Sequence, residues 1–161
     1  MKNMNKDGLL LCELQGKTFA LSIESLDMSS EIFIRRFVNS QISKSIDNTS
    51  ILETNIQPKD IIELIEEEFG YSNYGSVKYS NNEMYWIGYL YRYFAFTYEL
   101  SSLQVYKIIK PKELRGLYFA YHSLSPSQAI ERILESKGMM YNETIETKRQ
   151  LEILKKIREN R

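Results

Sequence analysis

Through most of the chain, hydrophobic residues recur every three or four positions, which is the spacing of one face of an α-helix. One such stretch follows Ser30, whose hydroxyl can cap a helix, and includes Phe33 and Phe37. Another starts at Pro58, a favourable first helical residue, and ends at Gly70, a typical helix terminator. These patterns predict two amphipathic helices in the first half of the chain.

The second half continues the same pattern. Residues 71–82 are rich in polar residues and tyrosine and contain a glycine, which predicts a loop. The predicted helices then cover residues 83–99, 102–109, 111–122, 126–137 and 142–158. Two of them begin at a proline, where the missing amide is no loss.

The N-terminal segment is ambiguous. Gln15 and Gly16 could turn a β-hairpin between two short strands within residues 9–23. Phe19 and Ile23 instead have helical spacing, and Thr18 could cap a helix there. We favour a short extended start followed by a helix.

These elements predict a mainly α-helical fold, a compact multi-helix bundle with one core. A length of 161 residues fits a single domain. We assign residues 1–141 to this domain and residues 142–161 to an amphipathic C-terminal helix. Its apolar stripe could dock on the core or on a partner.

The central helix is unusual because aromatic residues cover nearly all of its sides between residues 85 and 98. Such a helix lies in the core or at an interface, and buried tyrosine hydroxyls need hydrogen-bond partners. Tyrosine and arginine are enriched at binding hot spots, so Tyr89, Arg92 and Tyr93 are candidate contact residues. The alternative roles are core packing for the tyrosines and internal ion pairs for the candidate arginines, Arg35, Arg36 and Arg92.

Charge is unevenly distributed although the chain is neutral overall. Residues 51–100 carry three basic and eight acidic side chains, whereas residues 101–161 carry twelve and seven. Neutrality excludes a strongly basic histone-like protein and an acidic-tail protein. The acidic and basic parts could face each other, or one of them could face a charged partner.

Candidate chemistry is sparse. A single cysteine, Cys12, excludes a disulfide scaffold, and a single histidine, His122, excludes a metal site built on a histidine pair. Cys12 lies among leucines, a setting typical of a buried residue rather than a nucleophile. No glycine-rich phosphate loop and no Gly-x-Ser-x-Gly motif occurs. We expect no catalytic residue, metal or cofactor, although a site at Tyr121 and His122 stays a third hypothesis.

Four glutamates, at positions 63, 66, 67 and 68, fall within the predicted helix after Pro58. A solvated acidic face is the simplest interpretation, and a partner-facing patch is the next. No segment resembles a signal peptide or a membrane span, and a lone cysteine suits a reducing cytosol. We therefore expect a cytoplasmic protein.

Three stretches resemble a family of small proteins from Gram-positive bacteria: residues 32–37, residues 85–93, and residues 118–124 continuing to 129–130. The most specific is the run Tyr-Trp-Ile-Gly-Tyr-Leu-Tyr-Arg-Tyr at residues 85–93. Members of that family occur in short operons that look like toxin–antitoxin modules, beside a predicted ADP-ribosyltransferase-like toxin. The resemblance covers roughly residues 30–136 and supplies no catalytic residues.

The resemblance implies an antitoxin-like inhibitor that neutralises a partner toxin enzyme by direct contact. The expected contact residues are Arg35, Arg36, Tyr89, Arg92 and Tyr93. The alternative is a nucleic-acid-binding regulator of its own operon, which would use the lysines and arginines of residues 101–161. We expect no membrane partner.

Overall fold

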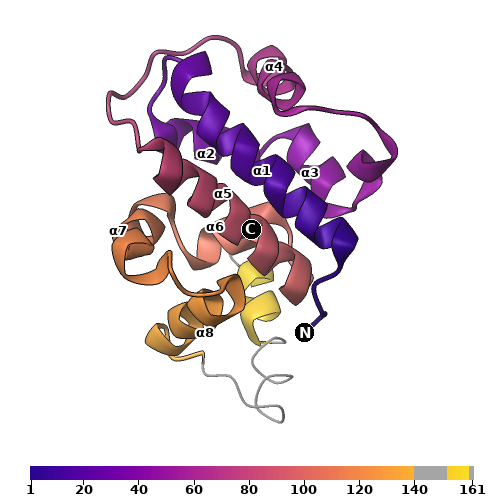
Figure 1. The fold of residues 1–161 in the computed structure, drawn as a ribbon, viewed down its shortest axis with the longest axis vertical. Helices are drawn as coiled ribbons and strands as arrows, with labels where there is room; N and C mark the ends of the chain where they lie inside the picture. The colour runs from indigo at the N-terminus through magenta and orange to yellow at the C-terminus, as the bar shows by residue number, and fades with distance from the viewer. Residues whose placement is uncertain (140–151, 160–161) are drawn as a thin grey trace. The chain divides into compact units, whose positions relative to one another are not determined.

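In the computed structural model, which describes residues 1–139 and 152–159, every regular element is a helix (Figure 1). The helices are α1 (Lys6–Ser25), α2 (Ser30–Val38), α3 (Gln41–Asp47), the 3-10 turn η1 (Ser50–Glu53), α4 (Pro58–Phe69), α5 (Asn81–Tyr98), α6 (Ser102–Ile108), α7 (Pro111–Tyr121) and α8 (Pro126–Ser136). Residues 152–159 are also helical. The prediction of a mainly helical fold is confirmed.

Serine residues determine where many of these helices begin. The hydroxyls of Ser29, Ser40, Ser80, Ser101 and Ser125 each accept a hydrogen bond from a backbone amide in the first turn of the following helix. Such caps satisfy amides that have no partner within the helix. The cap at Ser40 also explains why the helix that starts at Ser30 ends at Val38 and a separate helix, α3, follows.

The N-terminal segment corrects our expectation. It is neither a hairpin nor an extended start, because α1 is helical from Lys6, with Asn5 as its cap. Gln15 and Gly16 lie within this helix rather than in a turn. Gly16 packs closely against α5, since a Cβ there would lie 3.0 Å from the ring of Tyr85.

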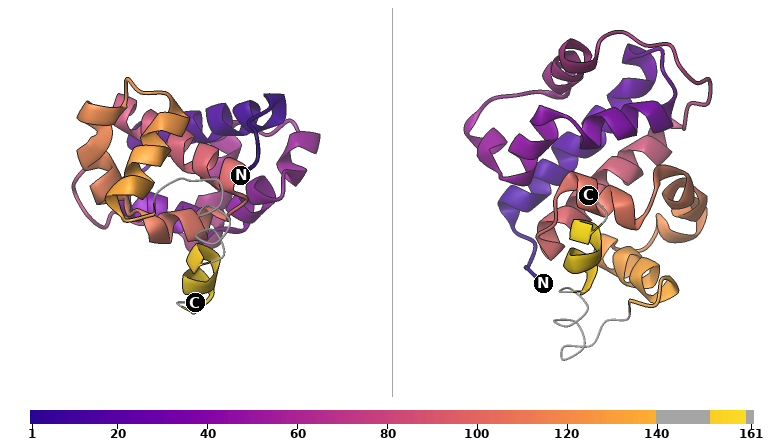
Figure 2. Two further views of the ribbon diagram at one scale, coloured as in Figure 1. Left: turned by 90° about the horizontal axis from the view of Figure 1, so that it is seen from below. Right: turned by 180° about the vertical axis from the view of Figure 1, so that it is seen from behind.

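Helices α1 and α5 are antiparallel neighbours, since Gly8 of α1 faces Phe96 and Gly16 faces Tyr85. This is the most extensive helix contact in the described chain, and both sets of views show the two helices side by side (Figures 1 and 2). From α5, Gly88 completes the fit, because a Cβ there would lie 2.8 Å from the carbonyl oxygen of Gln15. The small residues let the two backbones approach closely.

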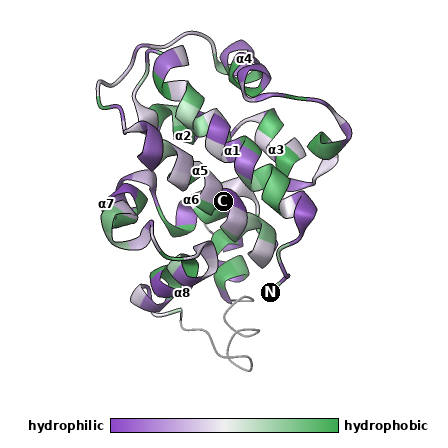
Figure 3. Ribbon diagram, viewed as in Figure 1, coloured by the Kyte–Doolittle hydropathy of each residue, from purple (hydrophilic) through white to green (hydrophobic). Residues whose placement is uncertain are grey.

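Apolar side chains from α1, α2, α4 and α5 fill the core beside this pair. The Phe19 ring makes edge-to-face contacts with Phe33 and Phe37, with ring centres 5.5 and 5.0 Å apart. Ile61 and Ile65 of α4 are also fully buried. Figure 3 shows both hydrophobic and hydrophilic residues on α4, and Ile61, Ile62 and Ile65 are buried, as expected for an amphipathic helix.

The chain divides into two compact units, Met1–Phe119 and Ala120–Arg161. In the second unit, α8 buries one apolar face made of Ala129, Ile130, Ile133 and Leu134. The predicted boundary between residues 141 and 142 falls outside the described residues, as does the first half of the predicted last helix. Within the described chain, no helix has both the length and the hydropathy needed to cross a bilayer.

Candidate functional site

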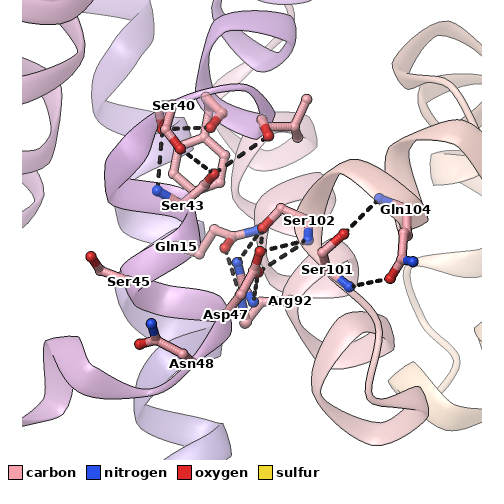
Figure 4. Close-up of polar contacts among 12 residues, drawn as sticks. Gln15, Ser40, Ser43, Ser45, Asp47, Asn48, Arg92, Ser101, Ser102 and Gln104 are labelled. Carbon is pink, nitrogen blue, oxygen red and sulfur yellow. Dashed lines mark hydrogen bonds and ion pairs between the residues drawn. The ribbon is translucent and has the colours of Figure 1, made fainter. Parts of the chain in front are cut away.

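Arg92 is the largest fully buried side chain of the described chain and is 2% exposed. Its guanidinium donates hydrogen bonds to Gln15 Oε1 at 2.8 Å, to Asp47 Oδ1 at 2.7 Å and to Ser102 Oγ at 2.6 Å (Figure 4). These partners come from α1, α3 and α6. A single side chain of α5 therefore joins three other helices of the first unit.

The partners of Arg92 are also bonded to one another. Ser102 donates to Asp47 through its hydroxyl at 2.7 Å and through its backbone amide at 3.0 Å. Gln15 Nε2 donates to the carbonyl oxygen of Gly88 at 3.0 Å. A buried charge is stable only when it is paired and hydrogen-bonded, and this network provides both.

A pocket of about 340 Å³ adjoins the ion pair and is lined by Lys2, Ile46, Asp47, Asn48, Thr49, Arg92, Ala95, Phe96, Glu99, Leu100 and Ser101. Thr49 and Glu99, at its edge, are the non-glycine residues with left-handed backbone in the described chain, with φ of 63° and 54°. Lys2 lies over the Phe96 ring at 4.2 Å. The lining balances two cations against two carboxylates and contains neither cysteine nor histidine.

Three tyrosines, Tyr85, Tyr89 and Tyr93, lie on successive turns of α5 and form what we call the tyrosine ladder. Their ring centres are 6.0 Å apart between Tyr85 and Tyr89 and 6.5 Å apart between Tyr89 and Tyr93. All three are partly exposed, and the neighbouring helix α1 presents the exposed residues Leu9 and Glu13. The ladder is thus an aromatic surface supported by the core.

The hydroxyls of Tyr85 and Tyr89 stay protonated at neutral pH. Burial is the main factor that raises the pKa of Tyr89 to about 12, and the nearby Cys12, Tyr85 and Glu13 add to it. The pKa of Tyr85 is raised in the same direction, again chiefly by burial. The ladder therefore offers flat apolar rings and protonated hydroxyls.

The five predicted contact residues fall into four environments. Tyr89 and Tyr93 belong to the ladder, as described above. Arg35 is exposed on α2. Arg36 donates to the carbonyl oxygen of Gly70 at 2.6 Å and lies 5.5 Å from the centre of the Phe69 ring, so it supports the end of α4.

Arg92 departs from the expected contact role because it is buried. A side chain with 2% exposure is not presented to a partner's surface, and its three hydrogen bonds give it an internal role. This is the internal ion pair that we gave as its alternative role, although no local signal identifies the partners. Gln15 and Asp47, two of its partners, are 77 and 45 positions away in the chain.

The remaining candidates for chemistry are separated. Cys12 is fully buried, and burial raises the pKa of its thiol to about 12, so the thiolate is not populated at neutral pH. His122 is exposed just after α7. The described residues contain no group of three or more His, Cys, Asp or Glu placed to hold a metal ion. Comparison with models of protein families, with curated proteins and with solved structures gives no match.

Proposed function

We propose that this protein is a cytoplasmic, protein-binding inhibitor of the antitoxin kind, without catalytic activity of its own. In this proposal it neutralises an adjacently encoded toxin enzyme, of ADP-ribosyltransferase-like type, by direct contact. The observation that carries the proposal is the tyrosine ladder, a partly exposed row of aromatic rings on the best-packed helix of the first unit. The family resemblance of residues 85–93 supports the same role.

The ladder suits a protein partner for a physical reason. Tyrosine brings a large contact area and one hydroxyl at a small loss of side-chain entropy, and it is therefore common at binding hot spots. Tyr85, Tyr89 and Tyr93 are held by helix packing before any partner arrives, which reduces the entropy lost on binding. Inhibition by such a surface needs complementarity to the toxin and no chemistry of its own.

The test is co-expression of the protein with the toxin from its operon. The wild type should restore growth and form a stoichiometric complex, whereas Tyr89→Ala with Tyr93→Ala should lose both effects. Phe119→Ala is the matched control, because this aromatic residue is 89% exposed on another helix. Circular dichroism must show that all variants are folded. Normal rescue by the folded double variant would refute the ladder as the contact surface.

Nucleic-acid binding is the second candidate, and one observation favours it. The helical residues 152–159 expose Lys155, Lys156 and Arg158. Phosphate contacts of this kind are strongest at low salt. A gel shift with the operon's own promoter at low salt, lost in a variant with all three residues changed to glutamine, would establish this function. No shift at low salt would remove it.

A further inference from the structure

The α4–α5 loop, residues 70–80, presents apolar side chains to solvent. Tyr71 and Tyr74 are 71% and 72% exposed, and Val77 is 52% exposed. Exposed residues of this size that follow one another within one short loop are unusual on a surface that has no partner. The loop therefore needs an explanation beyond the packing of unit 1.

Backbone hydrogen bonds hold this loop in one conformation although it has no regular structure. The amide of Ser29 donates to the carbonyl oxygen of Tyr74 at 3.0 Å, and the amide of Ser30 donates to that of Val77 at 3.1 Å. The amide of Tyr79 donates to the Ser30 hydroxyl at 2.9 Å. The start of α2 thus serves as a template for the loop.

Two further features fix the loop against the core. Lys78 Nζ donates to the carbonyl oxygens of Ile23 and Leu26, which end α1. Gly75 has a φ of 79°, and a Cβ at this position would lie 2.6 Å from the Ser29 hydroxyl. Only glycine allows the loop to lie this close to α2, so the exposed side chains are carried by a rigid backbone.

The composition of the loop resembles that of antibody binding loops. Residues 71–80 contain three tyrosines, three serines, one asparagine and one glycine, and these four residue types dominate antibody paratopes. Tyrosine supplies contact area there, and the small polar residues supply adaptable hydrogen bonds. The loop thus combines a recognition composition with a preorganised backbone.

An acidic pocket lies beside α4, the helix that precedes the loop. This pocket of about 450 Å³ lies between the end of α1 and α4, and it is lined by Ser25, Leu26, Lys59, Ile62, Glu63, Glu66 and Glu67. Glu66 Oε1 is buried and has no hydrogen-bond partner within the described chain. An acceptor in this state favours a ligand that donates hydrogen bonds.

Tyr71 connects the loop to this pocket. Its hydroxyl donates to Asp27 Oδ2 at 2.8 Å, and Asp27 follows Leu26 of the pocket lining. The pKa of Tyr71 is raised, first by this hydrogen bond, and the charge of Glu66 contributes to the rise. The exposed Tyr71 ring therefore lies near the carboxylates of Asp27 and Glu66.

We propose that the α4–α5 loop and the adjoining pocket bind an arginine-containing, basic segment of a partner protein. A guanidinium can pair with the carboxylates of Glu63 and Glu66 through several donors at once, and it can also lie over an exposed tyrosine ring. The inference deepens the proposed function, because it rests on a protein partner and assigns that partner a basic contact segment and this chain a second contact surface.

The direct test uses a fluorescein-labelled peptide of four arginines separated by glycines. Its fluorescence anisotropy is measured as the full chain is added, at low and at moderate salt. The same peptide with citrulline in place of arginine should not bind. Tyr74→Ala and Glu66→Gln should each weaken binding about tenfold, a typical effect at a hot spot. The matched controls Phe119→Ala and Glu53→Gln, both at exposed residues outside the surface, should change it less than about twofold.

Three results would overturn the inference. These are equal binding of the citrulline peptide, equal effects of test and control variants, and sedimentation showing that the loop is covered by a second copy of this chain. All variants are checked by thermal unfolding. Tyr74 is 72% exposed and Glu66→Gln keeps the side-chain shape, so both should fold normally.

A crosslinking experiment distinguishes a failure of this inference from a failure of the proposed function. A photoreactive phenylalanine analogue at position 74 should crosslink to the co-expressed toxin, and the same analogue at position 119 should not. Peptide binding without toxin inhibition would refute the proposed function and leave the inference standing. Toxin inhibition that survives both Tyr74→Ala and Glu66→Gln, without a crosslink from position 74, would refute the inference alone.

Discussion

Replacing Asp47 by alanine removes the carboxylate that balances the buried charge of Arg92. The Arg92 side chain is 2% exposed and that of Asp47 is 17% exposed, so solvent can replace the lost partner only in part. Ser102 also loses its acceptor for both its hydroxyl and its backbone amide. The guanidinium keeps only Gln15 and Ser102 as the partners that the structure gives it.

The magnitude follows from this geometry. Removing one partner of a buried ion pair costs about 3–5 kcal/mol of folding free energy. Because the Asp47 side chain is partly exposed, we expect the lower end, about 3 kcal/mol. Arg92→Met should cost less, about 1–2 kcal/mol, since it leaves a carboxylate that water reaches and that Ser102 still bonds.

The assay is urea unfolding followed by the fluorescence of Trp86, the only tryptophan of the chain, which packs edge-to-face on Tyr118 within the first unit. A loss of about 3 kcal/mol lowers the midpoint by about 1.5 M urea when the slope is about 2 kcal/mol/M. The double variant Asp47→Ala with Arg92→Met should be more stable than Asp47→Ala alone. Adding the second change removes the unpaired charge.

The difference in stability between the double variant and Asp47→Ala is the decisive result. If the double variant is less stable than Asp47→Ala, the unpaired guanidinium is not the source of the destabilisation. A midpoint for Asp47→Ala within about 0.3 M urea of the wild type would also refute the reasoning, because it would mean that the pair contributes almost nothing.

Three further predictions concern the backbone and the buried thiol. Gly88→Ala should destabilise the fold by about 1–3 kcal/mol, because its Cβ would clash with α1. Gly116→Ala should stabilise the fold by about 0.5–1 kcal/mol, because a Cβ there has no neighbouring atom within 4 Å. Thermal unfolding of both variants tests this difference. Glu99→Gly should raise stability by about 0.5–1 kcal/mol by relieving its left-handed backbone, and an unchanged urea midpoint would contradict this. Cys12 should react with a thiol reagent at pH 8 only after unfolding, since burial raises the pKa of its thiol to about 12. The folded state keeps a thiol proton that the unfolded state loses above about pH 9, so the free energy of unfolding should fall as the pH rises from about 9 to about 12. This fall should be smaller in Cys12→Ala.

The helices were predictable because their signals are local. Pro58 and Gly70 delimit α4 as the pattern indicated, and the polar segment 71–82 corresponds to the loop before α5 together with the first residues of that helix. The break at Ser40 has no clear signal in the sequence, because apolar residues continue through it at helical spacing. A serine cap competes with that spacing, and only the tertiary fold decides between them.

The first half of the N-terminal helix was not predictable from propensity, because Gly8 and Gly16 are typical turn residues, whereas the helical spacing of Phe19 and Ile23 did predict its second half. Their role emerges only with the partner helix: a Cβ at Gly8 would lie within 2.7 Å of the Phe96 ring, about ninety positions along the chain. Burial against α5 outweighs the weak helix propensity of glycine. The partners of Arg92 could not be predicted for the same reason, because they are distant from it in the sequence.

The candidate surfaces could be predicted only in part from the sequence, for the same reason. Aromatic composition marked α5 and residues 71–80 as unusual, yet it could not tell the partly exposed Tyr89 from the buried Tyr91, whose hydroxyl donates to the carbonyl oxygen of Ile109. Two positions along a helix change the direction of a side chain by about 200°. Which direction is covered depends on the neighbouring helices.

The Arg92 network, which joins four helices, and the α4–α5 loop, which we propose as a contact surface, should be separable by experiment. If the wild type is stable by about 6 kcal/mol, Asp47→Ala with a loss of about 3 kcal/mol still leaves more than about 99% of the molecules folded. The apparent affinity for a partner scales with that folded fraction and should stay within about 5% of the wild type. A tenfold loss of binding in Asp47→Ala would therefore mean that the ion pair shapes the binding surface itself, beyond its effect on stability.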